Sequence, residues 1–349
     1  MNDEVNMTAI QTDLIGGVHY IGIGVSNMKS AISFWESCGY NLDTATNMTA
    51  SLALRLYGLN SNAKVSVLKH QNATSGLIKL IQWEKPSGSG LQMAPLRTHG
   101  CRWSVHRTDN IANAYIHGEM LKRAGKKIYI VGPHYNFDLG KPEGIKKPFN
   151  QFLSTSGDVL LFQPEAQLVA MTRINFDVSK YGTININSPL RLSEGCHMAL
   201  VVQGDDLKIF DFYDEIIGFK KYQKIEISYK RGSMASDMFE LSEGESFTEV
   251  DFDDPESGDK PNQHLPGRLR CFLLKSSAPA DNRIIQSQPG NLGYSFYSFK
   301  TQNIYNTHQR VEKSNAKKVS NILTDEFGFL SFSFFAPDGF FWVARSATL

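Results

Sequence analysis

Short runs of alternating apolar and polar residues, each followed by a turn and an amphipathic segment, recur along the chain of 349 residues. The first run, Val18–Val25, is rich in β-branched residues, which predicts a half-buried strand. Ser26 and Asn27 are suitable helix N-caps, and the apolar residues of Met28–Trp35 recur with helical spacing up to Gly39. This stretch therefore predicts a strand, a loop and a helix.

The same unit begins again at Gly100, Gly195 and Tyr294. In the first unit three more apolar runs, at 50–56, 63–69 and 77–83, follow the helix and predict strands, so the unit is βαβββ. In the second unit the last strand is expected at 158–163, in the third at 268–275 and in the fourth at 339–344. The third unit's helix is expected at 207–217.

The repeat is strongest between alternate units. RWSVHRTDNI at 102–111 aligns with SFYSFKTQNI at 295–304, and Phe34-Trp35 with Gly39 aligns with Phe212-Tyr213 with Gly218. Units 1 and 3 therefore correspond, as do units 2 and 4, and the chain is a duplicated pair. A single unit cannot bury its own apolar strands, so we expect each unit to dock on a neighbour.

The remaining segments are expected to be connections. Residues 1–15 are predicted to be a flexible extension, and 132–148 is rich in glycine and proline. The acidic segment EVDFDDPESGDKP at 249–261 is predicted to be a solvated insertion, because its spacing lacks the pattern of a calcium-binding EF-hand.

Composition excludes several classes of partner. The 36 basic residues are balanced by 35 acidic ones, so the chain has no strong net charge whose electric field would attract nucleic acid or an anionic membrane. No apolar run is long enough for a transmembrane helix, and the polar N-terminus lacks a signal peptide's pattern. The four cysteines are far apart, as in reduced thiols of a cytoplasmic protein.

In three sequence motifs the chain resembles the vicinal oxygen chelate superfamily, which includes glyoxalase I, bleomycin-resistance proteins and extradiol dioxygenases. The motifs are HYIGIGVSNMKSAISFW (19–35), HMALVVQGDDLKIFDFYDEIIGF (197–219) and APDGFFWVA (336–344). The resemblance implies an α+β fold of four βαβββ modules, paired into two cupped, incomplete β-barrels with helices outside. We expect one such domain at 16–165 from units 1 and 2, a linker at 166–194, and a second domain at 195–349 from units 3 and 4.

That superfamily holds a divalent metal on His and Glu side chains of first and last strands. Transferred to this chain, the first-strand position falls on Tyr20, with His19 one residue away, and such a slip turns a side chain to the opposite face. In unit 3, His197 lies at or beside the ligand position. The last-strand Glu is replaced by Lys79 in unit 1 and by Arg270 in unit 3.

Units 2 and 4 have Trp103 and Phe296 at the first-strand position, and Leu160 and Val343 at the last. A dication needs two or three converging anionic or imidazole ligands. We therefore expect no metal and no other cofactor, the alternative being Fe or Mn held through relocated ligands.

Seven residues are candidates for a site. His197 and His19 are candidate acid/base groups, Lys79 and Arg270 would hold an oxyanion or carboxylate, and Tyr20, Trp103 and Phe296 would line a pocket for a flat ligand. The competing interpretation is structural: core histidines, solvent-facing cations and aromatic packing.

The leading hypothesis is a metal-independent protein that binds a small, aromatic or anionic organic molecule, as an isomerase or lyase. The alternatives are an extradiol-type dioxygenase or other metal enzyme with relocated ligands, and a non-catalytic binding or scaffold protein. The expected partners are a small-molecule ligand and a second copy in a homodimer, with no nucleic acid and no membrane.

Overall fold

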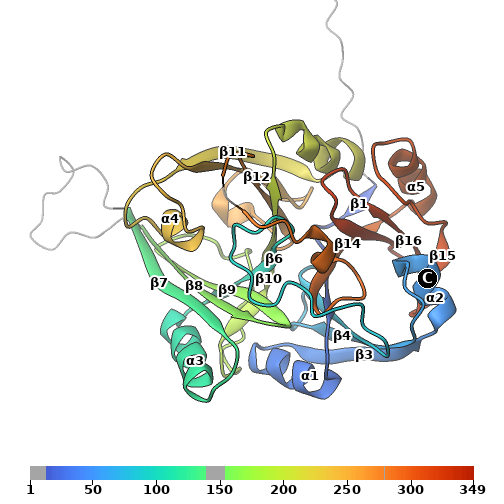
Figure 1. Cartoon of the computed structure of the whole chain (residues 1–349), viewed down its shortest axis with the longest axis horizontal. Helices are drawn as coiled ribbons and strands as arrows, with labels where there is room; N and C mark the ends of the chain where they lie inside the picture. The colour runs from blue at the N-terminus through green and yellow to red at the C-terminus, as the bar shows by residue number, and fades with distance from the viewer. Residues whose placement is uncertain (1–12, 139–153, 279) are drawn as a thin grey trace, which may run out of the picture.

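The computed structural model describes residues 13–138, 154–278 and 280–349, and they form two strongly curled sheets side by side (Figure 1). One sheet has nine strands and the other eight. Each curls into a cup that is open on one side. The fold is therefore α+β, with two cupped, incomplete β-barrels.

Units 1 and 4 build the nine-stranded sheet, in the order β15-β16-β17-β14-β2-β5-β4-β3, with β1 (Leu14–Ile15) paired to β14. Unit 1 contains β2 (Tyr20–Gly24), α1 (Met28–Ser37), β3 (Asn41–Met48), α2 (Ala50–Tyr57), β4 (Ala63–Lys69) and β5 (Leu77–Trp83). Unit 4 contains β14 (Gly293–Thr301), α5 (Ile304–Glu312), β15 (Leu323–Thr324), β16 (Leu330–Phe335) and β17 (Phe341–Ser346).

Units 2 and 3 build the eight-stranded sheet, in the order β11-β12-β13-β10-β6-β9-β8-β7. Unit 2 contains β6 (Arg102–Thr108), α3 (Ile111–Arg123), β7 (Tyr129–Asp138), β8 (Ser154–Gln163) and β9 (Ala166–Ile174). Unit 3 contains β10 (Leu192–Gln203), a 3₁₀ turn (Leu207–Phe210), a π-helical turn (Tyr213–Ile217), β11 (Lys220–Ser228), α4 (Met234–Met238), β12 (Ser246–Asp253) and β13 (Arg268–Leu274). Two further 3₁₀ turns, Pro261–Gln263 and Ile284–Ser287, lie in connections.

The expected pairing of consecutive units is wrong. The first strands join antiparallel at the centre of each sheet, β2 with β14 and β6 with β10, so unit 1 pairs with unit 4 and unit 2 with unit 3. Neither 16–165 nor 195–349 is therefore a complete barrel. The segment 166–194 is more than a linker, because it contains β9, the last strand of unit 2, which runs parallel to β6.

Several expected elements also differ. Leu14–Ile15 is a strand and not part of a flexible extension, since it pairs with Lys300 and Thr301. The apolar run expected as a strand at 50–56 is the helix α2, which Thr49 caps through the backbone N–H of Leu52. Of the segment 132–148, which was expected to be a loop, residues 132–138 belong to β7, and 139–148 lies outside the described residues.

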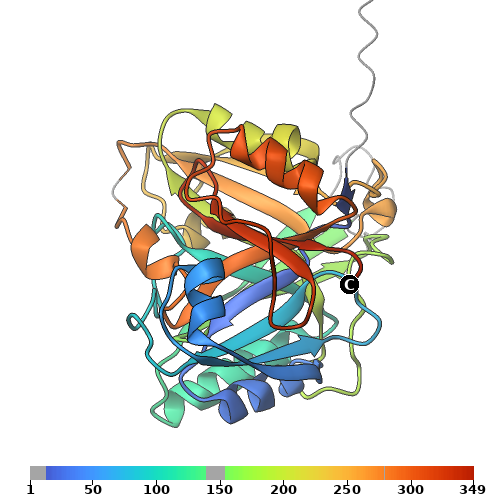
Figure 2. The same ribbon diagram turned by 90° about the vertical axis from the view of Figure 1, so that its right-hand side faces the viewer.

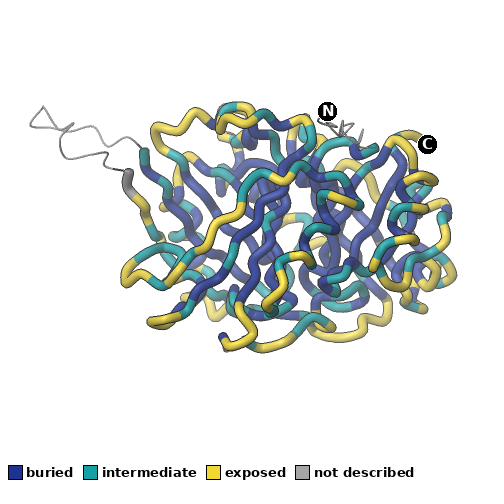
Figure 3. Tube along the Cα trace, turned by 90° about the horizontal axis from the view of Figure 1, so that it is seen from above, coloured by how far each residue is buried: buried dark blue, intermediate teal, exposed yellow. Residues whose placement is uncertain are grey.

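The main core lies between the two sheets and the helices α1, α3 and α5, which pack on the outer faces of the cups. The buried parts of the chain gather in the interior and the exposed parts at the periphery (Figure 3). Two smaller cores lie inside the cups, and α2 and α4 each contribute to one of them. The expectation of helices outside the barrels therefore holds for α1, α3, α5 and the helical turns of unit 3, but not for α2 and α4. Within the described residues, no helix is long and apolar enough to cross a membrane.

Candidate functional site

The cup of units 1 and 4 is filled by its own side chains. The helix α2 enters its open side (Figure 2), where Leu56 and Tyr57 pack with Phe296 of β14. The register places Phe296 opposite Gly22 on β2, and a Cβ atom at Gly22 would lie 2.1 Å from the Phe296 ring. Glycine is required there because the ring occupies the space above the strand. This is the packing role that the structural interpretation assigned to Phe296.

Lys79 lies beside this ring, with its ammonium 3.0 Å from the Tyr57 hydroxyl and 2.6 Å from the Glu326 carboxylate. Burial opposes its charge, but Glu326, Tyr57 and Asp325 together outweigh that effect and raise the pKa of Lys79 above its ordinary value. The Tyr20 ring is 5.8 Å from the same ammonium, so Tyr20 faces this cup, as the register predicts. The cation is thus neutralised by an internal acid.

The cup of units 2 and 3 contains a cavity of about 220 Å³. Two neighbouring registers place Trp103, Ala199 and Arg270 in one row across β6, β10 and β13. This row matches Phe296, Gly22 and Lys79 of the other cup, and both Trp103 and Arg270 line the cavity. The Trp103 ring stacks on Phe272, and further apolar walls come from Phe239, Phe247, Met171, Met234 and Met238.

The acidic segment expected as a solvated insertion begins inside β12. Its alternating residues Glu249, Asp251 and Asp253 are buried on the cup side, while Val250 and Phe252 join the main core. Asp251 accepts two hydrogen bonds from Arg270, at 2.7 and 2.9 Å, and Glu249 lies 3.2 Å from Nε of Arg270. Burial opposes the Arg270 charge, but the two carboxylates outweigh it and raise its pKa.

Glu249 is less well paired than Asp251. Burial raises the pKa of Glu249, and the attraction of Arg270 offsets this only in part. For Asp251 the guanidinium groups of Arg270 and Arg268 outweigh burial and lower its pKa. Glu249, on the cavity wall, is therefore easier to protonate than an ordinary glutamate.

His197 lines the same cavity, and its Nδ1 is 2.9 Å from the Tyr181 hydroxyl. Burial, reinforced by Arg270 and Arg268, lowers the pKa of His197 well below its ordinary value, so the ring is neutral at pH 7. His19 lies elsewhere: its Nδ1 donates to the Thr74 carbonyl at 2.9 Å on the side of units 1 and 4. Burial and Lys300 also lower its pKa.

A second ion pair and a short helix complete the cavity. Arg173 on β9 is 3.3 Å from Asp158 on β8, and burial raises the pKa of that aspartate. The helix α4 lies over the opening near β7 (Figure 1), with Asp237 3.5 Å from His134. The cavity is thus apolar and aromatic on one side and lined by neutralised charges on the other.

The donor set of this cup does not fit the superfamily's metal. Its first and last strands present to the cavity one imidazole, His197, and two guanidinium groups, Arg173 and Arg270. The carboxylates come from other strands and are bound to these cations. Cations at the last-strand positions repel a dication, so we derive no chemical step through a metal here. Within the described residues, no group of three His, Cys, Asp or Glu side chains converges.

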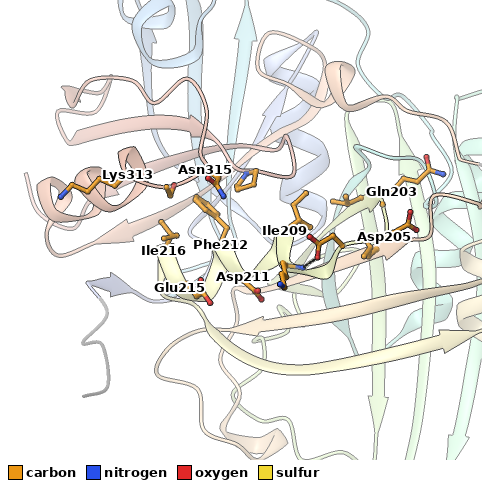
Figure 4. A pocket seen from close by; sticks show the side chains of 16 residues that line it. Gln203, Asp205, Ile209, Asp211, Phe212, Glu215, Ile216, Lys313 and Asn315 are labelled. Atoms are coloured by element: carbon orange, nitrogen blue, oxygen red, sulfur yellow. Dashed lines mark hydrogen bonds between the residues drawn. The ribbon is translucent and has the colours of Figure 1, made fainter. Parts of the chain in front are cut away.

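A larger groove of about 770 Å³ lies outside both cups (Figure 4). Ile209, Phe212 and Ile216 of unit 3 face Lys313 and Asn315 from the loop after α5. Its lining contains no imidazole and no thiol, and none of the predicted site residues. The groove therefore has fewer side chains suited to acid/base or nucleophilic catalysis than the cup.

Solved structures of other proteins have the same fold. The chain is similar to glyoxalase I from Zea mays, with 13% identity over 95% of this chain and 92% of that chain and a TM-score of 0.55. It is also similar to a dioxygenase-like protein of Bacillus subtilis, with 11% identity over 95% of this chain and 86% of that chain and a TM-score of 0.52. No protein-family profile and no curated protein sequence matches the chain. The chain therefore shares its fold with these two structures.

The tertiary structure divides the seven predicted residues between the cups. His197, Trp103 and Arg270 meet in one cavity, whereas Tyr20, Lys79 and Phe296 share the filled cup and His19 is hydrogen-bonded near it. Sequence reasoning missed Glu249, Asp158 and Arg173. For Glu249 a signal existed, because acidic and apolar residues alternate along 249–253 as on a strand with two buried faces.

Proposed function

We propose that the cup of units 2 and 3 binds a small aromatic organic molecule carrying a carbonyl or carboxylate oxygen. The observation that carries this is the convergence of His197, Trp103 and Arg270 in one cavity of about 220 Å³. The flat body of the ligand lies against Trp103 and Phe272, where stacking and burial favour it. Its oxygen faces His197 and the guanidinium groups.

We further propose a metal-independent proton transfer at this site, as in an isomerase or lyase. A tyrosine hydroxyl that donates to Nδ1 leaves the proton on Nε2 of His197, so the neutral ring donates to the ligand oxygen. Glu249 then accepts a proton from the carbon next to the carbonyl group. Arg270 beside it stabilises negative charge on the resulting enolate.

Ligand-observed NMR with a panel of aryl ketones, arylpyruvates and benzoates tests the binding. We expect at least one class to bind the wild type and to lose most of its affinity for a Trp103→Ala variant. Binding to the matched variant Phe296→Leu in the other cup should be unchanged. If no aromatic compound binds at millimolar concentration, the proposal of a ligand cup is wrong.

Deuterium incorporation into the bound carbonyl compound in D₂O tests the chemistry. We expect exchange with the wild type and with His19→Gln, and a loss of at least 100-fold with His197→Gln or Glu249→Gln. Binding without any exchange would overturn the proton transfer and leave a non-catalytic binding protein, which is one of the alternatives drawn from the sequence.

A further inference from the structure

A second cavity, of about 270 Å³, opens where three segments distant in sequence meet: 70–75, 180–194 and Pro266. The residues that line it do not overlap with those of the cup cavity. Its rim is exposed and polar, with Lys180 on one side. Its base consists of two buried side chains, His70 (0% exposed) and Glu194 (4% exposed).

The hydrogen bonds of His70 define which of its nitrogens carries the proton. Nε2 is 3.0 Å from the carbonyl oxygen of Leu192, and a carbonyl oxygen can only accept. Nε2 therefore donates, and Nδ1 of the neutral ring is an acceptor. Nδ1 is buried and has no hydrogen-bond partner among the described residues, while Oε2 of Glu194 lies 3.6 Å away.

Glu194 is also an acceptor. Burial raises the pKa of Glu194, whereas the backbone N–H of Thr183, which donates to its Oε2 at 2.9 Å, favours the ionised form. In that ionised form the carboxylate has no proton to give to His70. Two acceptors thus face each other at the base of a cavity with no donor between them. A buried polar atom without a partner is unfavourable, and a donor group with positive charge would satisfy both.

We propose that this cavity binds a small zwitterionic amine of the α-amino-acid type, with its ammonium group donating to Nδ1 of His70 and to the carboxylate of Glu194. An ammonium has three donors and no acceptor, which matches a base made of two acceptors. The ligand's carboxylate faces Lys180 at the rim. Because Glu194 and Lys180 balance each other, the cavity suits a ligand without net charge, and its volume admits a molecule of this size.

Titration calorimetry with the full chain tests the proposal, with L-amino acids, their N-acetyl derivatives and their methyl esters as probes. We expect saturable binding of an amino acid, a loss of at least tenfold on N-acetylation, and a smaller loss for the ester. Glu194→Gln should weaken binding at least tenfold, whereas the exposed control Glu36→Gln and the cup variant His197→Gln should not. The control in the cup separates this proposal from the proposed function.

Two further measurements keep the test decisive if Glu194→Gln folds poorly. Lys180→Met changes only an exposed side chain, and we expect it to abolish the preference for the free acid over the ester. Zn²⁺ and Mn²⁺ alone are titrated in parallel. Equal binding of amino acids and N-acetyl derivatives, no binding of either, or a metal that binds where amines do not would each overturn the proposal.

Discussion

The Tyr181 hydroxyl lies 2.9 Å from Nδ1 of His197 and links the segment after β9 to the proposed acid/base group of the cup. Both side chains are buried, and their rings are stacked with centroids 6.1 Å apart. In the proposed mechanism the Tyr181 hydroxyl donates this bond, which sets the tautomer of the imidazole and holds the ring in place. Tyr181 is therefore a positioning residue, because it acts on the ligand through His197.

Tyr181→Phe should remove this bond and keep the ring packing. We expect a five- to tenfold loss in ligand affinity or exchange rate, the equivalent of about 1 kcal/mol for a hydrogen bond. In ¹⁵N-correlated spectra the wild type should show His197 protonated at Nε2, and the variant a mixture of tautomers. The exposed control Tyr305→Phe should change neither reading. An unaltered tautomer in Tyr181→Phe would contradict the positioning role.

The titration of His197 gives a separate prediction. Its pKa in the folded protein lies well below the ordinary value because of burial and the nearby guanidinium groups. A lowered pKa means that the unfolded chain binds the proton more tightly, so this residue lowers stability as pH falls below about 6.5. An NMR titration should show no protonation of His197 between pH 8 and pH 6. Protonation of His197 with a midpoint near 6.5 would contradict the lowered pKa.

In the filled cup, we expect substitutions of Lys79 and Glu326 to have strongly coupled effects on stability. Lys79→Met leaves the fully buried Glu326 side chain without its cation, and should lower the free energy of unfolding by about 3–5 kcal/mol. The double variant Lys79→Met/Glu326→Gln removes both charges and should recover most of this loss. Urea denaturation measures all three proteins. Equal destabilisation of the single and double variants would mean that the ion pair is not the cause.

Because Asp338 is buried, we expect the stability of the protein to depend on its protonation and hence on pH. Burial raises the pKa of Asp338 to about 6. The hydrogen bond from the Tyr213 hydroxyl at 2.5 Å lowers this pKa, but it offsets the effect of burial only in part. The folded state then binds the proton more tightly than the unfolded state, so this contribution to stability is complete below about pH 4 and is lost as pH rises through about 6.

Asp338→Asn should therefore gain stability relative to the wild type as pH rises from 4 to 7, by up to about 3 kcal/mol. Urea denaturation at four pH values measures the difference, and the exposed Asp43→Asn is the matched control. A difference between variant and wild type that stays constant over this range would show that Asp338 does not titrate there.

We expect any side chain at position 22 to clash with the Phe296 ring. Gly22→Ala places a methyl group 2.1 Å from a carbon of the Phe296 ring, and should cost about 1–3 kcal/mol in unfolding free energy. Gly204→Ala is the control, because its added methyl group meets the nearest atom at 3.6 Å. Phe296→Leu should rescue Gly22→Ala in part. Without any rescue, the ring is not what requires glycine at this position.

The sequence by itself determined the four units and their correspondence, because strand and helix periodicity is local and the repeat preserves it. The repeat alone aligns Trp103 with Phe296 and Lys79 with Arg270, and the sheet registers place each pair at equivalent points of the two cups. Counting along the strand also placed Tyr20, and not His19, at the first-strand position, and in the structure the Tyr20 ring lies 5.8 Å from the Lys79 ammonium.

Only the tertiary structure decided which units pair and which cup is open. Hydrogen bonds between strands join residues such as Tyr20 and Ser298, which are 278 positions apart, and no local pattern contains that information. The helix α2 and the Glu326 side chain close one cup, whereas Ala199 and the β12 carboxylates leave a cavity in the other. Whether a buried cation meets an internal acid or a ligand depends on such distant neighbours. For this reason His197 and Arg270 could be proposed from the sequence, but the ion pair of Glu249 with Arg270 and the hydrogen bond between Tyr181 and His197 could not.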